Sequence, residues 1–279
     1  MPESNPVAYV RETRRVARVT FDNPPVNLST GATASALLQI VDDLAGDDDL
    51  RVLRFESAVP DFFLNHFDLS NLGDFPEPDA AGVSAWTNVV LALSRAPYIT
   101  VGTIRGRTRG GGNELALALD LTYASREKAF FGQPEVGTAV IPGGGGTERL
   151  PRAIGRGRAL EAILTSDDYD ATTAESWGWI TRALPDADLD AFVDQKVGRL
   201  AAFDRDAMAA AKALVNRSVL PQDTDLVTAY DEFVRFTTLP AYLARAASPA
   251  PTGQQALELE YRLGEFLGLA ALRRAASAD

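Results

Sequence analysis

The sequence predicts an α/β fold that ends in a helical region, and three observations support this. Strand and helix patterns alternate through the first half of the 279-residue chain, which is typical of βαβ units and a parallel sheet. The order strand, helix, strand is already complete by residue 55. Almost everything after residue 186 has apolar residues at helical spacing, so the last third should be mainly α-helical.

The N-terminal segment has a clear pattern. Two apolar runs within residues 6–23 flank the polar sequence RETRR, which predicts a β-hairpin. The Asn23-Pro24-Pro25 sequence should end the second strand. Apolar residues at helical spacing predict a helix from Thr30 to Leu44, followed by a short strand at Val52–Phe55. Residues 57–81 are rich in proline and polar residues and are expected to form a loop.

The middle and C-terminal elements follow from the same criteria. The ELALALDLTYA segment is ambiguous, because its alternation suits a strand while its Leu and Ala content suits a helix. We expect a short helix there and then a strand at Leu121–Ala124. Four glycines at 143–146 precede Thr147, the expected N-cap of a helix. The other expected elements are a helix at 83–95, a buried strand at Tyr98–Ile104, a glycine-rich turn at 106–112, helices at 147–165 and 171–178, a loop at 248–253 and a last amphipathic helix at 254–272.

The composition is that of a globular protein, with 46% hydrophobic and 23% charged residues. The chain has 27 Lys and Arg against 38 Asp and Glu, so its formal net charge is −11. A phosphate backbone or an anionic membrane surface would repel such a charge, so we expect no nucleic-acid partner and no membrane. The apolar stretches are far shorter than the roughly 20 residues that span a bilayer, and the N-terminus lacks the apolar segment of a secretory signal.

Cysteine is absent and His66 is the single histidine. Disulfides, cysteine nucleophiles and multi-histidine zinc sites are therefore excluded, and we expect no metal. The lack of cysteine fits a cytoplasmic location. The chemistry must come from carboxylates, backbone amides, hydroxyls or a borrowed cofactor.

The first candidate motif is the run from Gly110 to Glu114, GGGNE, where a strand ends and a helix begins. Glycines let the backbone approach a ligand closely, and a helix N-terminus stabilises a developing oxyanion. The alternative is a tight strand–helix connection without a ligand. Neither this run nor GGGGTER has the spacing of a dinucleotide or phosphate-binding loop.

Two further motifs carry titratable side chains. Glu135 follows Gly132 and Pro134 in a rigid loop, and an apolar pocket would raise its pKa and make it a general acid. The alternative is a solvated loop carboxylate. His66 lies in the sequence FLNHFD and is either a catalytic base or a structural histidine. A serine hydrolase is weakly supported, since the Gly-x-Ser-x-Gly motif is missing.

Taken together and in this order, the three motifs resemble the enoyl-CoA hydratase/isomerase (crotonase) superfamily. The likeness is closest over residues 104–155, and it is weaker from about residue 8 to residue 215 and in the last helix. The resemblance implies an α/β, crotonase-like spiral of βαβ units with a C-terminal helical region. It also implies a division into a spiral core at 1–190 and an oligomerisation region at 191–279, and a homotrimer or homohexamer.

The resemblance further implies an oxyanion hole for the enolate of an acyl-CoA thioester. Its two backbone amides would belong to Gly111 and to Phe67, which stands where the family usually has alanine. Glu114 and Glu135 match the two glutamates of the hydratases. Glu114 would hold and activate water, and Glu135 would protonate the substrate at Cα. Gly143 matches a glycine whose amide helps to position that water.

The sequence departs from the family pattern at two places. The family's Ala-Gly-Ala-Asp reads Asn65-His66-Phe67-Asp68 here, and His66 could contact a CoA phosphate or fill space. We expect Asn65, His66 and Asp68 to lie at the substrate. The last helix, where the family tends to place basic residues at the phosphates, carries the acidic Glu258 and Glu260, and Arg262 is the nearest cation. A carrier-protein thioester is therefore an alternative to acyl-CoA.

We therefore expect an enoyl-CoA hydratase, a lyase that adds water in the syn sense to a 2-enoyl-CoA. The coenzyme A is part of the substrate, so no separate cofactor is needed. The alternatives are a Δ3-Δ2 enoyl-CoA isomerase or another acyl-thioester enzyme, such as a decarboxylase or a hydrolase. A non-catalytic crotonase-fold scaffold or RNA-binding protein is a third possibility, which the acidic charge and the two retained glutamates disfavour.

Overall fold

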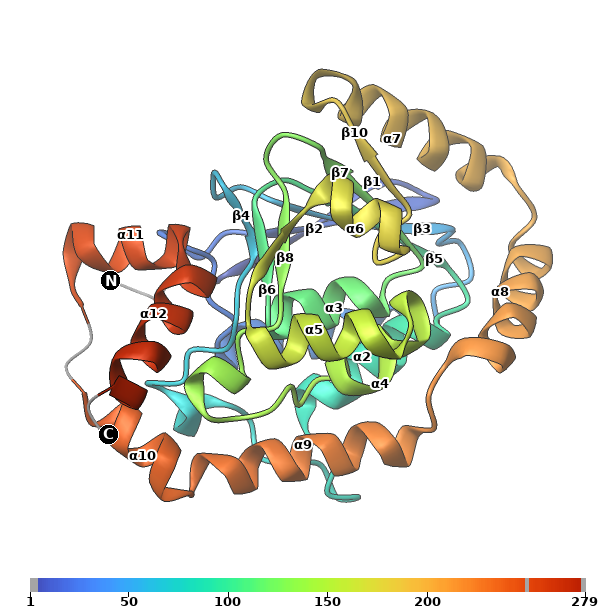
Figure 1. Cartoon of the computed structure of the whole chain (residues 1–279). Coiled ribbons are helices and arrows are strands. Elements are labelled where there is room, and N and C mark those ends of the chain that lie inside the picture. The colour runs from blue at the N-terminus through green and yellow to red at the C-terminus, as the bar shows by residue number, and fades with distance from the viewer. Residues whose placement is uncertain (1–4, 249–250, 277–279) are drawn as a thin grey trace.

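The computed structural model describes residues 5–248 and 251–276, and it confirms the expected α/β fold (Figure 1). Strands and helices alternate as far as residue 184, and helices alone follow. Part of the loop expected at 248–253 lies outside the described residues.

The larger sheet has the strand order β1-β2-β3-β5-β7-β10 within the described residues. Its first two strands form the expected antiparallel hairpin, and the other pairs are parallel. These strands are β1 (Val7–Thr13), β2 (Val16–Phe21), β3 (Val52–Ser57), β5 (Ile99–Ile104), β7 (Leu121–Ser125) and β10 (Arg182–Leu184).

A smaller sheet with the order β4-β6-β8-β9 lies beside it, built from three-residue strands. The pairs β4–β6 and β6–β8 are parallel, and β8–β9 is antiparallel. The strands are β4 (Phe62–Leu64), β6 (Arg107–Arg109), β8 (Phe130–Gly132) and β9 (Asp168–Asp170). Sequence analysis missed all four, and assigned β4 and β6 to loops. Three residues are too few to show alternation, and β4 is buried along its whole length.

The helices complete a spiral. One strand enters each sheet and a helix follows, three times in succession: β3, β4 and α2, then β5, β6 and α3, then β7, β8 and α4–α5. The helices of this core are α1 (Gly31–Leu44), α2 (Ala85–Arg95), α3 (Gly111–Ala118), α4 (Gly146–Ile154), α5 (Arg156–Thr165) and α6 (Ala171–Trp177), with the short 3-10 turns η1 (Leu72–Asp74) and η2 (Val136–Thr138).

Three details of the expected helices are wrong. The helix expected at 147–165 is two helices, α4 and α5, because Gly155 between them has a positive φ of 80° and leaves the helical conformation. Thr147 is not an N-cap, because Gly145 takes that position in a left-handed conformation and the Thr147 hydroxyl instead donates to Glu148. The single last helix expected at 254–272 is two helices, α11 (Gly253–Tyr261) and α12 (Leu263–Ala276), which meet at Arg262 outside the helical conformation.

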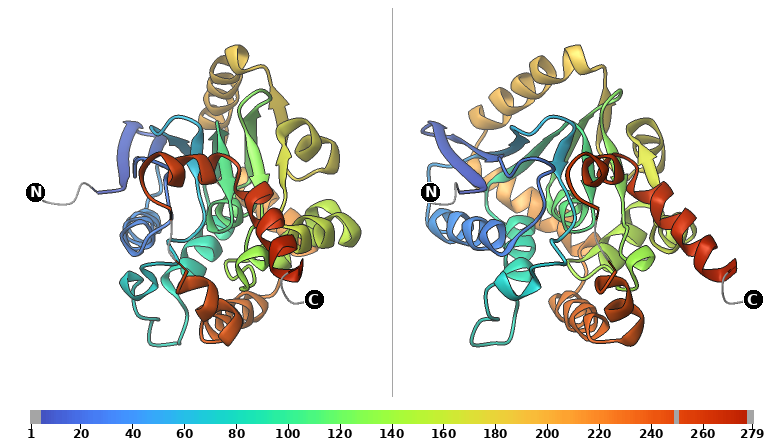
Figure 2. Two further views of the ribbon diagram at one scale, coloured as in Figure 1. Left: turned by 60° about the vertical axis from the view of Figure 1, so that its left-hand side comes forward. Right: turned by 90° about the vertical axis from the view of Figure 1, so that its left-hand side faces the viewer.

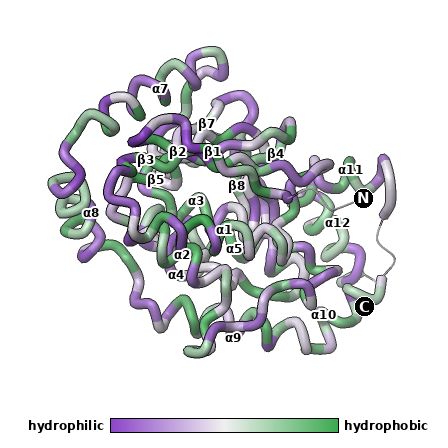
Figure 3. The backbone as a smooth tube through the Cα atoms, turned by 180° about the vertical axis from the view of Figure 1, so that it is seen from behind, coloured by the Kyte–Doolittle hydropathy of each residue, from purple (hydrophilic) through white to green (hydrophobic). Residues whose placement is uncertain are grey.

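Four more helices connect the spiral to this pair: α7 (Asp186–Ala202), α8 (Arg205–Val219), α9 (Asp223–Thr237) and α10 (Pro240–Ala246). The boundary expected at residue 190 falls inside α7, whose Leu189, Val193 and Val197 pack against the larger sheet. The division at that residue remains a prediction. α9 packs against α2 and α4, while α12 contacts η2 and β9 (Figures 1 and 2). α8 lies at the periphery and carries hydrophobic stretches (Figure 3).

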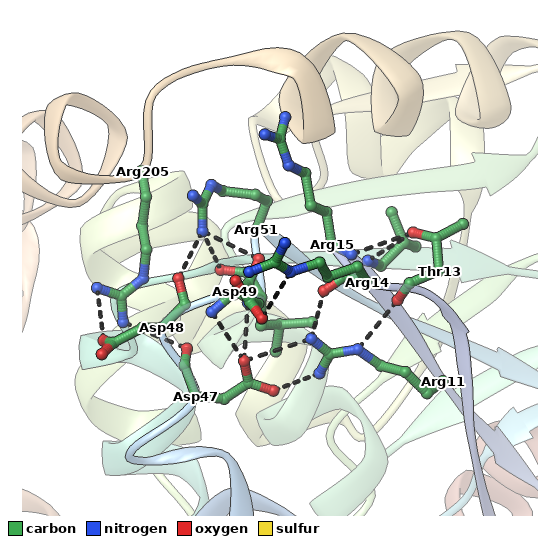
Figure 4. Close-up of polar contacts among 11 residues, drawn as sticks. Arg11, Thr13, Arg14, Arg15, Asp47, Asp48, Asp49, Arg51 and Arg205 are labelled. Carbon is green, nitrogen blue, oxygen red and sulfur yellow. Dashed lines mark hydrogen bonds and ion pairs between the residues drawn. The ribbon is translucent and has the colours of Figure 1, made fainter.

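The hairpin is joined to the rest of the chain by an arginine–aspartate network at the α1–β3 turn (Figure 4). Arg11 pairs with Asp47, and the Arg14 Nε donates to Asp49 at 2.8 Å. Arg205, at the start of α8, pairs with Asp48 at 3.4 Å. Because several of these side chains are exposed, the network orders the turn and adds little to stability.

Gly112 in α3 lets this helix approach β4 closely. A Cβ atom at this position would come within 1.8 Å of the Leu64 backbone oxygen. We expect Gly112→Ala to lower the free energy of unfolding by about 2 kcal/mol or more, because backbone must move to relieve the collision. Urea denaturation measures it.

The matched control is Gly268→Ala in α12, where an added Cβ meets nothing within 4 Å. There the better helix propensity of alanine should leave stability unchanged or raise it by up to about 1 kcal/mol. Equal effects of the two substitutions would refute the close-approach explanation.

Candidate active site

Three chain segments converge at the glycine run that begins α3. A Cβ atom at Gly110 would lie 2.6 Å from Glu135 Oε1 and 2.9 Å from the His66 Cβ. One at Gly111 would lie 2.6 Å from the Phe67 ring. The run therefore lets the loop after β4 and the loop after β8 come within contact of the helix start. Glu114 is carried into the same region on the first turn of α3.

Glu114 is buried, with 1% of its surface exposed. Its Oε1 accepts hydrogen bonds from the backbone amides of Gly144 at 2.7 Å and Gly146 at 2.9 Å. Its Oε2 is buried without a hydrogen-bond partner among the described residues. Burial raises the pKa of this carboxyl to about 7, although the two amides oppose the shift. One oxygen is thus fixed and the other is free to bind a ligand.

Glu135 lies at the start of η2, in the loop after β8, and is also buried. Burial raises its pKa well above the usual value, and the nearby charge of Glu114 raises it further. Its Oε2 likewise has no partner within the described ranges. Because Glu114 has two amide donors that stabilise its ionised form, Glu114 should lose its proton before Glu135 does.

The Phe67 and Gly111 amides lie on the two segments that meet here. The Phe67 ring covers the face of Gly111, and neither amide donates a hydrogen bond to any residue in the described part of the chain. Unpaired amides at a helix start and in a neighbouring loop can bind an oxyanion. Nothing in the structure tests that role directly, so it remains a prediction.

The Phe67 ring belongs to an aromatic cluster. It makes edge-to-face contacts with Phe75, Trp86 and Phe233, at centroid distances of 5.1, 5.1 and 5.8 Å. A cavity of about 130 Å³ adjoins the ring. It is lined by Phe67, Leu72, Phe75, Tyr230, Phe233, Val234 and Thr237. Its far wall is α9, and α12 contributes no lining residue.

On its other side the loop after β4 is polar. His66 donates from Nδ1 to the Phe67 carbonyl at 2.9 Å and from Nε2 to the Glu260 carboxylate at 3.3 Å. Burial alone would lower the pKa of His66, but Glu260 outweighs it and the net shift is upward. Asn65 also donates to Glu260, at 2.8 Å. The His66 imidazole therefore forms an ion pair with Glu260 on α11.

The remaining expected residues, Asp68, Gly143 and Arg262, each have other contacts. Asp68 bonds to its neighbours Ser70 and Asn71. Gly143 packs against Phe233, since a Cβ there would lie 2.6 Å from the Cβ of that residue. Arg262 contacts Glu265, Glu258 and Phe266, all within the last two helices. None of these contacts joins it to Glu114 or Glu135.

Sequence reasoning missed two side chains beside Glu114, Trp86 and Gln133. Trp86 Nε1 and Gln133 Nε2 are buried without partners among the described residues. A Cβ at Gly144 would lie 2.5 Å from Glu114 Oε2 and 2.6 Å from that indole nitrogen. The Gln133 oxygen accepts from Asn113 at 2.6 Å, which turns its amide nitrogen toward Gly146. The run of four glycines was the available signal for these amides.

The described ranges, 5–248 and 251–276, contain no cluster of three or more His, Cys, Asp or Glu side chains that could hold a metal ion. They also contain no helix with the length and apolarity needed to cross a bilayer.

Comparison with known proteins identifies the family. The sequence model of the enoyl-CoA hydratase/isomerase family matches residues 11–238. The Mycobacterium bovis protein named probable enoyl-CoA hydratase echA8 is 30% identical over 213 residues, which cover 75% of this chain and 80% of that protein. The chain belongs to the enoyl-CoA hydratase/isomerase family, and the resemblance noted from its motifs is confirmed.

Solved structures show the same fold. A Streptomyces avermitilis crystal structure, provisionally assigned as an enoyl-CoA hydratase, is 36% identical, with a TM-score of 0.87 and coverage of 94% of this chain and 96% of that one. A monofunctional enoyl-CoA isomerase from M. smegmatis is 29% identical, with a TM-score of 0.65 and coverage of 77% and 94%. The family thus contains both activities, and membership alone does not choose between them.

Burial of the Glu114 charge should make stability depend on pH. Because its pKa is raised from 4.5 to about 7, the folded state prefers the protonated form. The contribution is fully present below about pH 4.5 and is lost as the pH rises through 7. Glu114→Gln keeps the amide contacts without the charge. We expect the unfolding free energy of this variant, relative to wild type, to rise by about 2.5 kcal/mol between pH 5 and pH 8.

Urea denaturation at the two pH values measures this difference. Exposed Glu161 on α5 provides the control, because Glu161→Gln should change stability equally at both. A Glu114→Gln difference that stays constant across this range would contradict a raised pKa.

Proposed function

We propose that the protein is an enoyl-CoA hydratase that adds water to a 2-enoyl-CoA thioester. The observation that carries this proposal is the pair of buried carboxylates, Glu114 and Glu135, each with one unpartnered oxygen. They lie next to the Phe67 and Gly111 amides, which have no acceptor in the described chain. Hydration needs this combination of two acid–base groups and an oxyanion site.

In the proposed mechanism the thioester oxygen accepts hydrogen bonds from the Phe67 and Gly111 amides. Glu114 removes a proton from water, and the water oxygen bonds to the β-carbon. The double-bond electrons move toward the thioester oxygen and form an enolate, which the amides stabilise. The enolate then takes a proton from Glu135 at the α-carbon. The same steps in reverse describe dehydration.

The environments of the two carboxyls support this division of roles. Glu114 accepts from two amides, which favours its ionised form and suits a base. Glu135 has the raised pKa of a buried group beside a like charge, which suits an acid. Gly143 directly precedes Gly144, which bonds to Glu114, so its amide could hold the same water. Nothing in this mechanism requires a cofactor beyond coenzyme A itself.

The second candidate is a Δ3-Δ2 enoyl-CoA isomerase, which needs one carboxylate to carry a proton between two carbons. The isomerase among the structural relatives keeps this candidate open. Two carboxyls with raised pKa values favour hydration, because an isomerase has no use for the second. Acyl-CoA is the proposed substrate form. The pairing of His66 with Glu260 leaves its phosphate contact without support.

Substitution of either glutamate tests the mechanism. We expect Glu114→Gln and Glu135→Gln each to lower kcat for crotonyl-CoA hydration by roughly 100-fold or more, because general acid–base catalysis is lost. Loss of the enoyl absorbance measures the rate. Glu161→Gln should have wild-type activity.

Each other outcome has a defined meaning. Full turnover in both glutamine variants would refute the hydratase mechanism. A loss confined to Glu135→Gln, with consumption of a 3-enoyl-CoA, would identify an isomerase. RNA binding in a shift assay at physiological salt, without turnover of any thioester, would favour a non-catalytic RNA-binding protein with this fold.

We also propose that the chain forms a homotrimer or homohexamer. α8 contains no buried residue and exposes Leu214, Val215 and Val219, and such an apolar helix face is typical of an interface. Light scattering should give three or six times the 29.9 kDa mass of the chain. Leu214→Asp should reduce the mass, and a monomeric wild type would refute the proposal.

A further inference from the structure

The Phe67 side chain separates the candidate oxyanion hole from the apolar cavity beside it. Its ring lies against Gly111, so that a Cβ there would be 2.6 Å from the ring. It also lines the 130 Å³ cavity, together with Phe75 and Phe233. Only 6% of Phe67 is exposed. A substrate that reaches the cavity from the two amides must therefore pass this ring.

The two sides of the loop differ in chemistry. Toward α11 the loop presents the ion pair of His66 with Glu260, and toward α9 it presents the aromatic cluster. A thioester carbonyl held by the two amides has a polar pantetheine arm on one side and an apolar acyl group on the other. Burial of the acyl group is favourable only on the aromatic side, because the other side holds charged groups that need polar partners.

Resting on the hydratase function above, we propose that the Phe67 ring is the specificity-determining wall of the acyl site and restricts the enzyme to 2-enoyl thioesters with short acyl groups. Its backbone amide donates a hydrogen bond to the thioester carbonyl. Its side chain limits the length of the acyl chain beyond the α- and β-carbons.

The size of the cavity supports a short acyl group. At about 130 Å³ the cavity is smaller than the roughly 300–1,000 Å³ of typical small-molecule sites, so a short acyl group fits it better than a long one. Movement of the Phe67 ring to enlarge the cavity is opposed by packing. Trp86 and Phe233 hold the ring by edge-to-face contacts and are themselves buried.

Chain-length selectivity tests the proposal. We would measure kcat/KM for the 2-enoyl-CoA thioesters crotonyl, octenoyl and dodecenoyl in wild type and in Phe67→Ala, which keeps the backbone amide. Wild type should prefer crotonyl-CoA. In Phe67→Ala the dodecenoyl-to-crotonyl ratio should rise by about tenfold or more, because each added methylene can then be buried. Phe203→Ala, which removes a ring from the exposed end of α7, should leave the ratio at its wild-type value.

Phe67→Leu covers the case in which Phe67→Ala does not fold, because leucine is smaller than phenylalanine but still fills most of the core position. It should shift the ratio in the same direction by a smaller factor. An unchanged ratio in the folded variant, or a wild type that prefers dodecenoyl-CoA, would overturn the proposal.

Binding of saturated acyl-CoAs separates this proposal from the hydratase assignment. Titration calorimetry with butyryl- and lauroyl-CoA measures selectivity without turnover. If wild type does not hydrate and the Phe67 variant shifts its binding toward lauroyl-CoA, the hydratase function is refuted and the role of Phe67 as the wall of the acyl site is supported. If wild type hydrates crotonyl-CoA and the variant keeps the wild-type binding selectivity, the function is supported and the role of Phe67 is refuted.

Discussion

The burial of two carboxyl groups side by side is the constraint on which the rest of the structure depends. Water is removed from both Glu114 and Glu135, and the charge of Glu114 raises the cost of ionising Glu135 further. The fold offsets part of this cost with two backbone amides directed at Glu114 from the glycine run before α4. It leaves the second oxygen of each group unsatisfied. Such polar atoms destabilise a folded protein unless a ligand binds them, so stability is lost where chemistry is to be done.

The spiral explains how distant segments reach one point. The loop after β4, the start of α3 and the loop after β8 are spread over residues 65–135 of the sequence, yet β4, β6 and β8 are neighbours in the small sheet. Their carboxyl ends therefore meet at one edge. The glycines at 110–112 permit contact between backbones there, because side chains at these positions would collide with Glu135, Phe67 or Leu64.

Local sequence patterns were sufficient for most of the larger sheet and most helices, because those elements are long enough to show periodicity. They were insufficient for β10 in that sheet and for the whole small sheet, because all of these strands have only three residues. The glutamates were found through motifs, but the amides that hold Glu114 lie 30 and 32 residues away and depend on how α4 packs. Likewise, the pairing of His66 with Glu260 joins residues 194 apart. The direction of the Phe67 ring depends on Phe233 and Trp86, and no motif contains that information.

Two of the contacts that attach α11 to the core are made through main-chain oxygens. Arg109 donates to the carbonyl of Glu260, and Arg107 donates to that of Tyr261 at 3.0 Å. Any residue type supplies such a carbonyl, so these two contacts place few demands on the side chains of α11. Substitutions elsewhere in α11 could therefore accumulate while the anchoring arginines stay in place. Glu260 is the exception, because its carboxylate is held through the side chains of His66 and Asn65.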